Sequence, residues 1–288
     1  MTKLFRFPML VVFLCVLPIL KVAGGEPLQV MSFNIRYDNP RDGLDNWKFR
    51  ATKVSGMFAK HDIGIAGLQE VQHHQLTWLK QALPDYAFVG VGRDDGKKKG
   101  EYAPLAYRKS EFELQASETI WLSETPAEVG SKGWDAALPR IATFAILSHR
   151  ETGAKLLAGS VHYDHVGVRA RKNSGAVLAK YIAEKQRSLA LAAILVVGDF
   201  NCRPASEPFK AVESAGVLMD SFRLTEKRIG PESTWSGFRA VEPGRRIDYV
   251  FVNKGVTVVR HLIDAEKVNG RFPSDHLPVV VQLKLKDQ

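Results

Sequence analysis

Short apolar runs that end in polar residues recur along the chain and predict most of its secondary structure. Mostly apolar runs bounded by turn residues are typical of buried strands. By this pattern we expect strands at Leu28–Asn34, Asp62–Leu68, Tyr86–Val91, Pro104–Tyr107, Phe112–Trp121, Ile141–Leu147, Leu156–His162, Ala192–Val197, Arg246–Val252, Val256–Ile263 and Pro278–Leu285. Apolar residues at helical spacing predict helices at Trp47–Lys60, around Leu76, Leu79 and Leu83, and at Arg169–Leu189.

The order of these elements indicates an α/β fold. The chain begins as strand, helix, strand and helix, which favours layered packing of helices on a sheet. The remainder has many strands and few, separated helices, so two packed sheets with helices outside fit better than one doubly wound sheet. Because no linker, repeat or low-complexity tract divides the 288 residues, we expect one large domain.

The segment Val197-Gly198-Asp199-Phe200-Asn201 carries the first candidate chemistry. The apolar run that starts at Ala192 ends here, and ligand-binding groups of α/β sheets gather at the carboxyl ends of strands. Asp199 can accept a proton or bind a metal, and Asn201 can donate hydrogen bonds to a developing anion. Because side chains alternate along a strand, residues 199 and 201 share a face if the strand continues that far.

Polar residues follow apolar runs at several other places: Asn34, Glu70, His162 with Asp164, Asp248, and Asp275 with His276. Any one of them alone is more often a cap, a turn residue or a structural histidine. Their repeated occurrence at the ends of different strands is harder to explain by turn chemistry. We therefore interpret the set as one functional site.

The residue types in this set suit metal-assisted hydrolysis of phosphate esters. Glu70, Asp275 and Asn34 offer the hard oxygen ligands that Mg²⁺ or Mn²⁺ prefers. Asp199 is suited to orienting or deprotonating a water, and His276 to contacting a phosphoryl oxygen. The sequence contains no HExxH zinc motif, GxxxxGK[ST] loop, GxSxG elbow or GxGxxG turn. These absences count against zinc peptidases, nucleotide triphosphatases, esterases and dinucleotide-binding enzymes.

Six short motifs, in this order, resemble the endonuclease/exonuclease/phosphatase superfamily: Ser32-Phe33-Asn34, Leu68-Gln69-Glu70-Val71, Val161-His162, Gly198-Asp199-Phe200-Asn201, Arg246-Ile247-Asp248-Tyr249-Val250 and Ser274-Asp275-His276-Leu277-Pro278. The resemblance covers about residues 28–285 and implies a four-layer αββα sandwich, with two packed mixed β-sheets flanked by helices. It also implies a role for each motif residue. Asn34, Glu70 and Asp275 would surround the divalent metal, Asp199 would activate the water, and Asn201 would help bind the phosphate. His162 and His276 would bind or protonate phosphoryl oxygens, and Asp248 would orient His276.

Segments such as Gly133-Trp134-Asp135-Ala136-Ala137 further resemble a bacterial branch of this superfamily, which implies the chemistry and leaves the substrate open. The chain has no insertion rich in basic and aromatic residues for gripping duplex DNA. We therefore expect small organic phosphates, phosphosugars or lipid headgroups ahead of polynucleotides as substrates. A secreted nuclease acting on DNA or RNA is the alternative enzyme. A non-catalytic binding module is the alternative outside enzymes, but every motif position carries a competent side chain.

Three further residues are candidates for substrate binding. Arg140 opens a predicted strand and its planar donor fork suits a phosphate, although a surface salt bridge explains it equally well. Tyr107 and Asp164 are open to the same two interpretations. Trp134 and Trp235 lie in glycine-containing loops, where they would either stack on a sugar or base or pack within the loop.

The N-terminal segment differs from the rest of the chain. Lys3 and Arg6 precede the apolar stretch Phe7–Leu20, and small residues follow, as in a secretory signal peptide. We expect residues 1–25 to be removed and the catalytic domain, residues 26–288, to be exported to the periplasm or beyond the cell without a stable membrane span. An uncleaved anchor is the alternative. Cleavage would lower the net charge from +9 to +6 and leave Cys202 as the only cysteine, so no internal disulfide could form.

Overall fold

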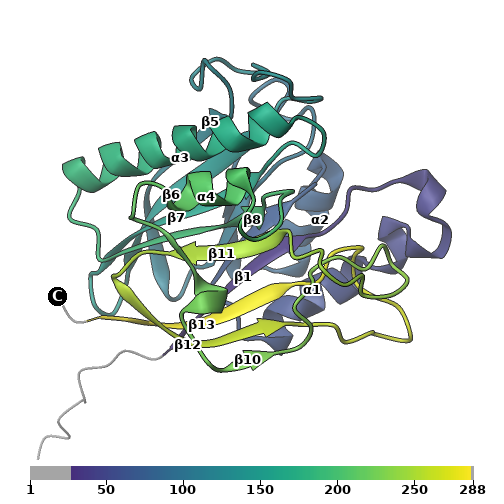
Figure 1. The fold of residues 1–288 in the computed structure, drawn as a ribbon. Helices are drawn as coiled ribbons and strands as arrows, with labels where there is room; N and C mark the ends of the chain where they lie inside the picture. Colours follow the sequence, from purple (N-terminus) through teal and green to yellow (C-terminus); the bar gives the residue numbers. More distant parts are fainter. Residues whose placement is uncertain (1–26, 287–288) are drawn as a thin grey trace, which may run out of the picture.

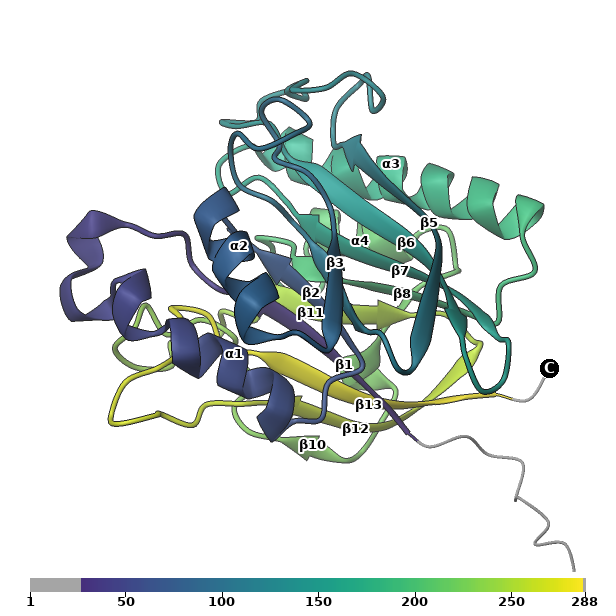
Figure 2. The same ribbon diagram turned by 180° about the vertical axis from the view of Figure 1, so that it is seen from behind.

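The computed structural model describes residues 27–286, so the predicted signal segment lies outside the described residues. Residues 27–286 form two mixed β-sheets that pack face to face, with helices on both outer sides (Figures 1 and 2). The expected four-layer αββα sandwich is confirmed.

The first sheet has seven strands in the order β10-β12-β13-β1-β2-β4-β3. Their bounds are β1 (Leu28–Asn34), β2 (Ile65–Gln69), β3 (Tyr86–Val89), β4 (Leu105–Arg108), β10 (Arg228–Ile229), β12 (Val256–Ile263) and β13 (Val279–Leu285). Strands β1 and β2 are parallel, whereas β4 and β13 run antiparallel to their neighbours β2 and β1. Helices α1 (Ala51–Lys60) and α2 (His73–Ala82) cover the outer face of this sheet (Figure 2).

The second sheet has six strands in the order β5-β6-β7-β8-β11-β9. Their bounds are β5 (Phe112–Trp121), β6 (Ile141–His149), β7 (Lys155–His162), β8 (Ala193–Asp199), β9 (Met219–Asp220) and β11 (Asp248–Val252). Strands β7 and β8 are parallel, and β6 and β11 run antiparallel to them. Helices α3 (Val168–Ser188) and α4 (Glu207–Glu213) cover the outer face (Figure 1).

The helix predicted at Trp47–Lys60 is divided. Its first residues form the 3-10 helix η2 (Trp47–Phe49), and α1 begins only at Ala51, because Arg50 has a non-helical backbone. The Arg50 guanidinium is buried and donates to backbone carbonyls, including Asp45 O at 2.7 Å and Arg36 O at 2.8 Å. Helix α4 and the 3-10 helices η1 (Pro40–Asp45) and η3 (Ser221–Arg223) were not predicted, because they are too short for an apolar period to show.

Strand alternation sends apolar side chains to different layers of the sandwich. In β8, Leu195 and Val197 pack between the sheets, whereas Ile194 and Val196 pack under α3 and α4. The sheets approach so closely that a Cβ atom at Gly67 in β2 would collide with the side chain of Val197. The two sheets are therefore in close contact at Gly67, where only a residue without a side chain fits.

At one edge of the sandwich, four polar residues follow the apolar side chains that face the space between the sheets. Asp199 follows Leu195 and Val197 in β8, and Asn34, His162 and Asp248 occupy the equivalent phase of β1, β7 and β11. His162 and Asp248 are the direct register partners of Asp199 on either side. The fold therefore gathers these four side chains where the interior opens to solvent.

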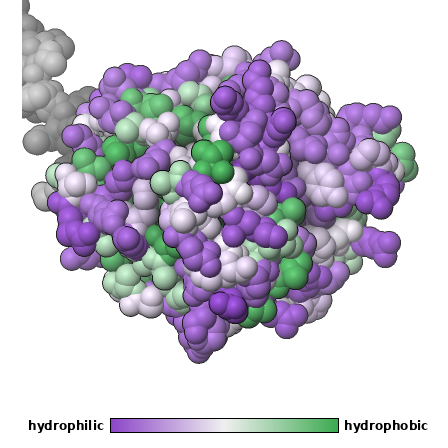
Figure 3. All heavy atoms as spheres, turned by 90° about the horizontal axis from the view of Figure 1, so that it is seen from above, coloured by the Kyte–Doolittle hydropathy of each residue, from purple (hydrophilic) through white to green (hydrophobic). Residues whose placement is uncertain are grey.

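The face of the molecule seen in Figure 3 carries both hydrophobic and hydrophilic residues. On the face shown in Figure 3, hydrophobic residues lie in small groups among hydrophilic ones. Within residues 27–286, none of the helices has the length and apolar character that crossing a membrane requires.

Candidate active site

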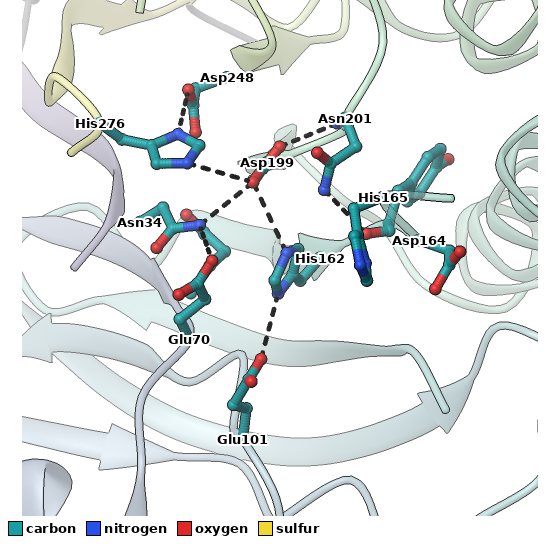
Figure 4. Close-up of polar contacts among 12 residues, drawn as sticks. Asn34, Glu70, Glu101, His162, Asp164, His165, Asp199, Asn201, Asp248 and His276 are labelled. Atoms are coloured by element: carbon teal, nitrogen blue, oxygen red, sulfur yellow. Dashed lines mark hydrogen bonds and ion pairs between the residues drawn. The ribbon is translucent and has the colours of Figure 1, made fainter. Parts of the chain in front are cut away.

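A cavity of about 530 Å³ opens at this edge of the sandwich. Its lining includes predicted site residues from both sheets and their connecting loops: Glu70, Arg140, His162, Asp199, Asn201 and His276. Asp199 lies at the centre, between His162, His276, Asn34 and Asn201 (Figure 4).

The Asp199 carboxylate is held by hydrogen bonds from two sides. Its Oδ1 atom accepts from the Asn201 backbone N–H at 2.8 Å, and Oδ2 accepts from Asn34 Nδ2 at 3.1 Å. Burial, together with the neighbouring charge of Asp248, raises the pKa of Asp199 to about 7. A carboxylate with a pKa near neutrality is suited to accept a proton from water.

His276 and Asp248 form a buried pair. The His276 Nδ1 atom lies 2.9 Å from Asp248 Oδ2, and His276 Nε2 lies 3.8 Å from Asp199 Oδ2. Burial lowers the pKa of His276, but the nearby charges of Asp248 and Asp199 outweigh it and raise the pKa to about 10. The ring is further fixed by Trp235, which packs edge-on at 4.8 Å between ring centroids. The predicted orientation of His276 by Asp248 agrees with this geometry, and the charged ring can donate towards the cavity.

His162 has the opposite electrostatic character. Its Nε2 atom lies 3.6 Å from Asp199 Oδ2, and Arg140 Nη1 lies 3.1 and 3.2 Å from its two ring nitrogens. Burial, reinforced by the positive charges of Arg140 and Arg93, lowers the pKa of His162 well below its ordinary value. The neutral ring is therefore suited to hydrogen bonding rather than to protonating a leaving group.

Asp164 lies behind the cavity and holds Arg140 in place. Its carboxylate accepts from Arg140 Nε at 3.2 Å and from four backbone N–H groups, of Ala137, Leu138, Val166 and Gly167. Figure 4 shows this carboxylate pointing away from Asp199. Asp164 is therefore a positioning residue, and the interpretation that it binds substrate is replaced by one in which Arg140 faces the ligand.

Glu70 and Asp275 form the acidic part of the site, close to Asn34. Glu70 has a left-handed backbone with φ of 59°, which turns its side chain into the site, where Asn34 Nδ2 donates to Oε1 at 3.0 Å. Burial raises the pKa of Asp275, and the charge of Glu70 adds to this effect. Asp275 is buried and Glu70 is half-buried, and two neighbouring carboxylates that offer only oxygen atoms suit a hard divalent cation.

The hydrogen bonds of Asn34 differ from those expected of a metal ligand, whose side-chain oxygen would face the metal. Its Nδ2 atom donates to both Glu70 and Asp199, and its Oδ1 atom accepts from the Arg36 backbone N–H at 3.0 Å. In this arrangement Asn34 bridges the two carboxylates. Glu70 and Asp275 are the residues whose donor atoms best fit the metal.

A second group of possible metal ligands is Asp199, Asp248 and His276. Each contributes one donor atom, and the three atoms lie within 4.8 Å of one another. However, Asp248 already engages the Nδ1 atom of His276, and the raised pKa of the ring favours its doubly protonated form, which has no lone pair for a metal. Of these two groups, the acidic pair Glu70 and Asp275 offers oxygen ligands alone, which hard divalent cations prefer.

The structure places the other predicted residues as follows. Asn201 lines the cavity, and its Nδ2 donates to Tyr163 O at 3.1 Å, which leaves the second N–H for a ligand. Tyr107 is wrongly predicted, because it lies in β4 within the apolar layer between the sheets. Trp235 borders the cavity, whereas Trp134 lies in a separate depression beside α3. Cys202 is a buried free thiol, and burial raises its pKa to about 12.

Several residues of the cavity were not predicted individually: Arg36, Tyr37, Glu101, His165 and Arg245. Arg36 Nη1 lies 3.6 Å from Asp275 Oδ2, and Arg140 Nη2 lies 2.8 Å from His165 Nδ1. Arg245 stacks its guanidinium on Trp235 at 4.7 Å from the ring centroid. The left-handed backbone of Arg36, with φ of 60°, is not visible in an apolar pattern.

Comparisons with known proteins agree with this site. The model of the Endonuclease/Exonuclease/phosphatase family matches residues 31–276. The solved structure of the endonuclease/exonuclease/phosphatase from Bacteroides vulgatus is 38% identical, covers 91% of this chain and 100% of that chain, and has a TM-score of 0.86. The mannosyl-6-phosphatase of Bacteroides thetaiotaomicron is 37% identical, covers 89% of this chain and 99% of that chain, and has a TM-score of 0.84.

A more distant relative is nocturnin of Mus musculus, which is 21% identical over 303 residues. The alignment covers 92% of this chain and 67% of nocturnin, so the chain spans about two thirds of the length of that relative. Endonucleases, exonucleases and phosphatases all hydrolyse phosphoester bonds, so the family match confirms the enzyme class predicted from the sequence. The chain belongs to the endonuclease/exonuclease/phosphatase family.

Proposed function

We propose that this protein hydrolyses phosphate esters of small organic molecules, with phosphosugars as the leading class, by direct attack of water and with Mg²⁺ or Mn²⁺ as cofactor. The observation that carries the proposal is the position of Asp199. It is a buried carboxylate at the centre of a solvent-open cavity, between a charged histidine and a neutral one. Its charge is poorly solvated there, so it gains by accepting a proton from water.

The residues of the site include a base for the attacking water and positively charged groups for the phosphoryl oxygens. Asp199 Oδ2 would accept the water proton, while Asn34 and Asn201 keep the carboxylate in one orientation. His276, kept charged by Asp248, would hold a phosphoryl oxygen as negative charge grows there. Arg140 would hold a second oxygen, since its guanidinium is fixed from behind by Asp164.

Enzymes of this family generally use divalent metal ions. Glu70 and Asp275 would hold the ion, and a bound ion would offset negative charge on the phosphoryl group. The choice between Mg²⁺ and Mn²⁺ belongs to the same proposal, because oxygen ligands accept both.

Two observations support a small phosphate ester as substrate. The cavity of about 530 Å³ is of the size that small-molecule sites commonly have. The mannosyl-6-phosphatase is 37% identical over nearly the whole chain. The one dense basic run, Lys97 to Lys99, is exposed beside Asp94 and Asp95, so it forms a solvated loop rather than a groove for a polynucleotide.

A substrate panel with Mg²⁺ or Mn²⁺ tests the proposal: hexose 6-phosphates, inositol phosphates, p-nitrophenyl phosphate, bis-p-nitrophenyl phosphate, sphingomyelin, DNA and RNA. We expect turnover of small phosphate esters that EDTA abolishes. Asp199→Asn keeps the shape and removes the base, so kcat should fall by about 10²–10⁴-fold. Full activity after exhaustive chelation, or a preference for DNA or RNA, would contradict the proposal.

We also propose that the protein is exported after removal of residues 1–25. The support is the sequence pattern, a basic start followed by the apolar stretch Phe7–Leu20 and small residues. Sequencing of the N-terminus of protein from the native host should find a start between about Gly24 and Leu28. A soluble cytoplasmic protein that keeps Met1 would show that the segment is not a cleaved signal.

A further inference from the structure

Glu101 is a cavity carboxylate for which the proposed hydrolysis has no use. It lies on the far side of His162 from Asp199, with Oε2 3.8 Å from His162 Nδ1 (Figure 4). Its side chain is only 18% exposed. Because a carboxylate repels a phosphate, a further carboxylate beside the phosphate-binding groups indicates contact with a different part of the substrate.

Arg93 fixes this carboxylate in one orientation. Its Nη1 donates to Glu101 Oε2 at 2.7 Å, and its Nη2 donates to Oε1 at 3.2 Å. The backbone of Arg93 is fixed as well, because its N–H donates to the Glu101 carbonyl and its carbonyl accepts from Trp121 Nε1 at 2.7 Å. The two-point contact uses one lone pair of each carboxylate oxygen, so each oxygen can accept a further hydrogen bond.

Glu101 also lies at the border between the main cavity and a second depression of the surface. It lines the main cavity, and it lines a neighbouring depression of about 380 Å³ together with Arg93, His73 and Lys98. Tyr37 is the other residue shared by both spaces. A substrate with its phosphate held by His276 and Arg140 in the main cavity can therefore extend its organic part past Glu101.

The chemistry of the Glu101–Arg93 pair matches hydroxyl groups. Carboxylate oxygens accept hydrogen bonds from hydroxyls, and an adjacent guanidinium offers donors to the oxygens of the same hydroxyls. The same negative charge repels the neighbouring phosphates of a polynucleotide. We propose that Glu101, held by Arg93, binds hydroxyl groups of the sugar that carries the phosphate, and so determines specificity for sugar phosphates. This inference rests on the proposed phosphoesterase function and adds a specificity-determining residue to it.

Two kinds of substrate with similar leaving groups, hexose 6-phosphates and an alkyl phosphate, test the inference. Glucose and mannose 6-phosphates and n-hexyl phosphate are all monophosphates of primary alcohols, but only the sugars carry further hydroxyls. Glu101→Ala should lower kcat/KM for the sugar phosphates by about 10- to 100-fold more than for hexyl phosphate, mainly through KM. Glu101→Gln keeps the volume and one acceptor, so its loss should be smaller. As a control, Glu113→Ala removes an exposed carboxylate on β5, and it should leave kcat/KM unchanged for both kinds of substrate.

The outcomes separate the possible roles. Equal losses on both substrates would assign Glu101 to positioning His162 or to general catalysis, and unchanged kinetics would assign it to structure alone; both results would overturn the inference. Thermal midpoints of both variants check that the fold is kept, and Glu101→Gln decides if Glu101→Ala fails to fold. A wild-type enzyme that hydrolyses hexyl phosphate but no hexose 6-phosphate refutes the inference alone. A wild-type enzyme that hydrolyses no phosphate ester with Mg²⁺ or Mn²⁺ refutes the proposed function, and the inference with it.

Discussion

The buried Asp164 carboxylate binds the backbone of a loop and also binds Arg140. The substitution Asp164→Asn distinguishes the effects of these two contacts. Asp164 Oδ1 accepts from three backbone N–H groups, the shortest contact being 2.7 Å to Gly167 N. Oδ2 accepts from Leu138 N at 3.4 Å and from Arg140 Nε at 3.2 Å. An asparagine can keep the first set with its oxygen, but its NH₂ group then faces two donors and leaves them without an acceptor.

The size of both effects follows from these contacts. Loss of a hydrogen bond between charged groups typically costs about 2 kcal/mol, and for a chain of this size that corresponds to a fall of about 4–8 °C in thermal midpoint. Arg140 would lose its fixed orientation, so kcat/KM should fall by about 10- to 100-fold. Arg140→Ala removes the phosphate contact itself, for which we expect a loss of about 10²–10³-fold.

A double-mutant cycle provides the assay. If Asp164 acts on catalysis only through Arg140, Asp164→Asn in the Arg140→Ala background should lower kcat/KM by less than about 3-fold further. The thermal midpoint should still fall, because the contacts to the loop backbone are disturbed in either background. If the loss of kcat/KM in the double variant equals the product of the losses in the two single variants, Asp164 contacts substrate directly, as the sequence alone suggested. That result would refute the positioning role.

The apolar pattern predicted the two sheets and many of the site residues for one physical reason. Buried strands are short and apolar, and a polar residue directly after them lies where the core ends. Asn34, His162 and Asp199 come at the carboxyl ends of β1, β7 and β8, all of which reach the same edge. The predicted bounds Phe112–Trp121 and Val256–Ile263 are those observed, since both strands are limited by clear turn residues.

The same rule fails where strand direction matters. Tyr107 also lies near a strand's carboxyl end, but β4 runs antiparallel to β2, so that end lies at the opposite edge from the site. By the same reversal, residues just before antiparallel strands reach the site: Arg140 precedes β6, and Glu101 lies in the segment before β4. A linear sequence does not show strand direction, so Glu101 could not be distinguished from an ordinary loop carboxylate.

Three further outcomes are expected. His276→Ala should lower kcat more than Asp248→Asn does, since His276 contacts the reacting group and Asp248 orients the ring; steady-state kinetics that reverse this order would contradict the assignment. Glu70→Ala should weaken Mn²⁺ binding in calorimetry while the thermal midpoint without metal stays unchanged or rises, because the repulsion between Glu70 and Asp275 is removed. The last concerns stability: burial, with Arg246 nearby, lowers the pKa of His261 to about 3. The unfolded histidine binds a proton below about pH 6.5 and the folded one does not, so this contribution is complete above pH 6.5 and is lost as the pH falls towards 3. Between pH 7.5 and 5.0 the wild type should therefore lose about 2 kcal/mol more than His261→Leu in urea unfolding with EDTA present. The test compares how steeply the free energy of unfolding falls with pH in the two proteins, because the altered packing of leucine changes that free energy equally at every pH. If the free energies of unfolding of both proteins fall in parallel, His261 accepts its proton in the folded state as well.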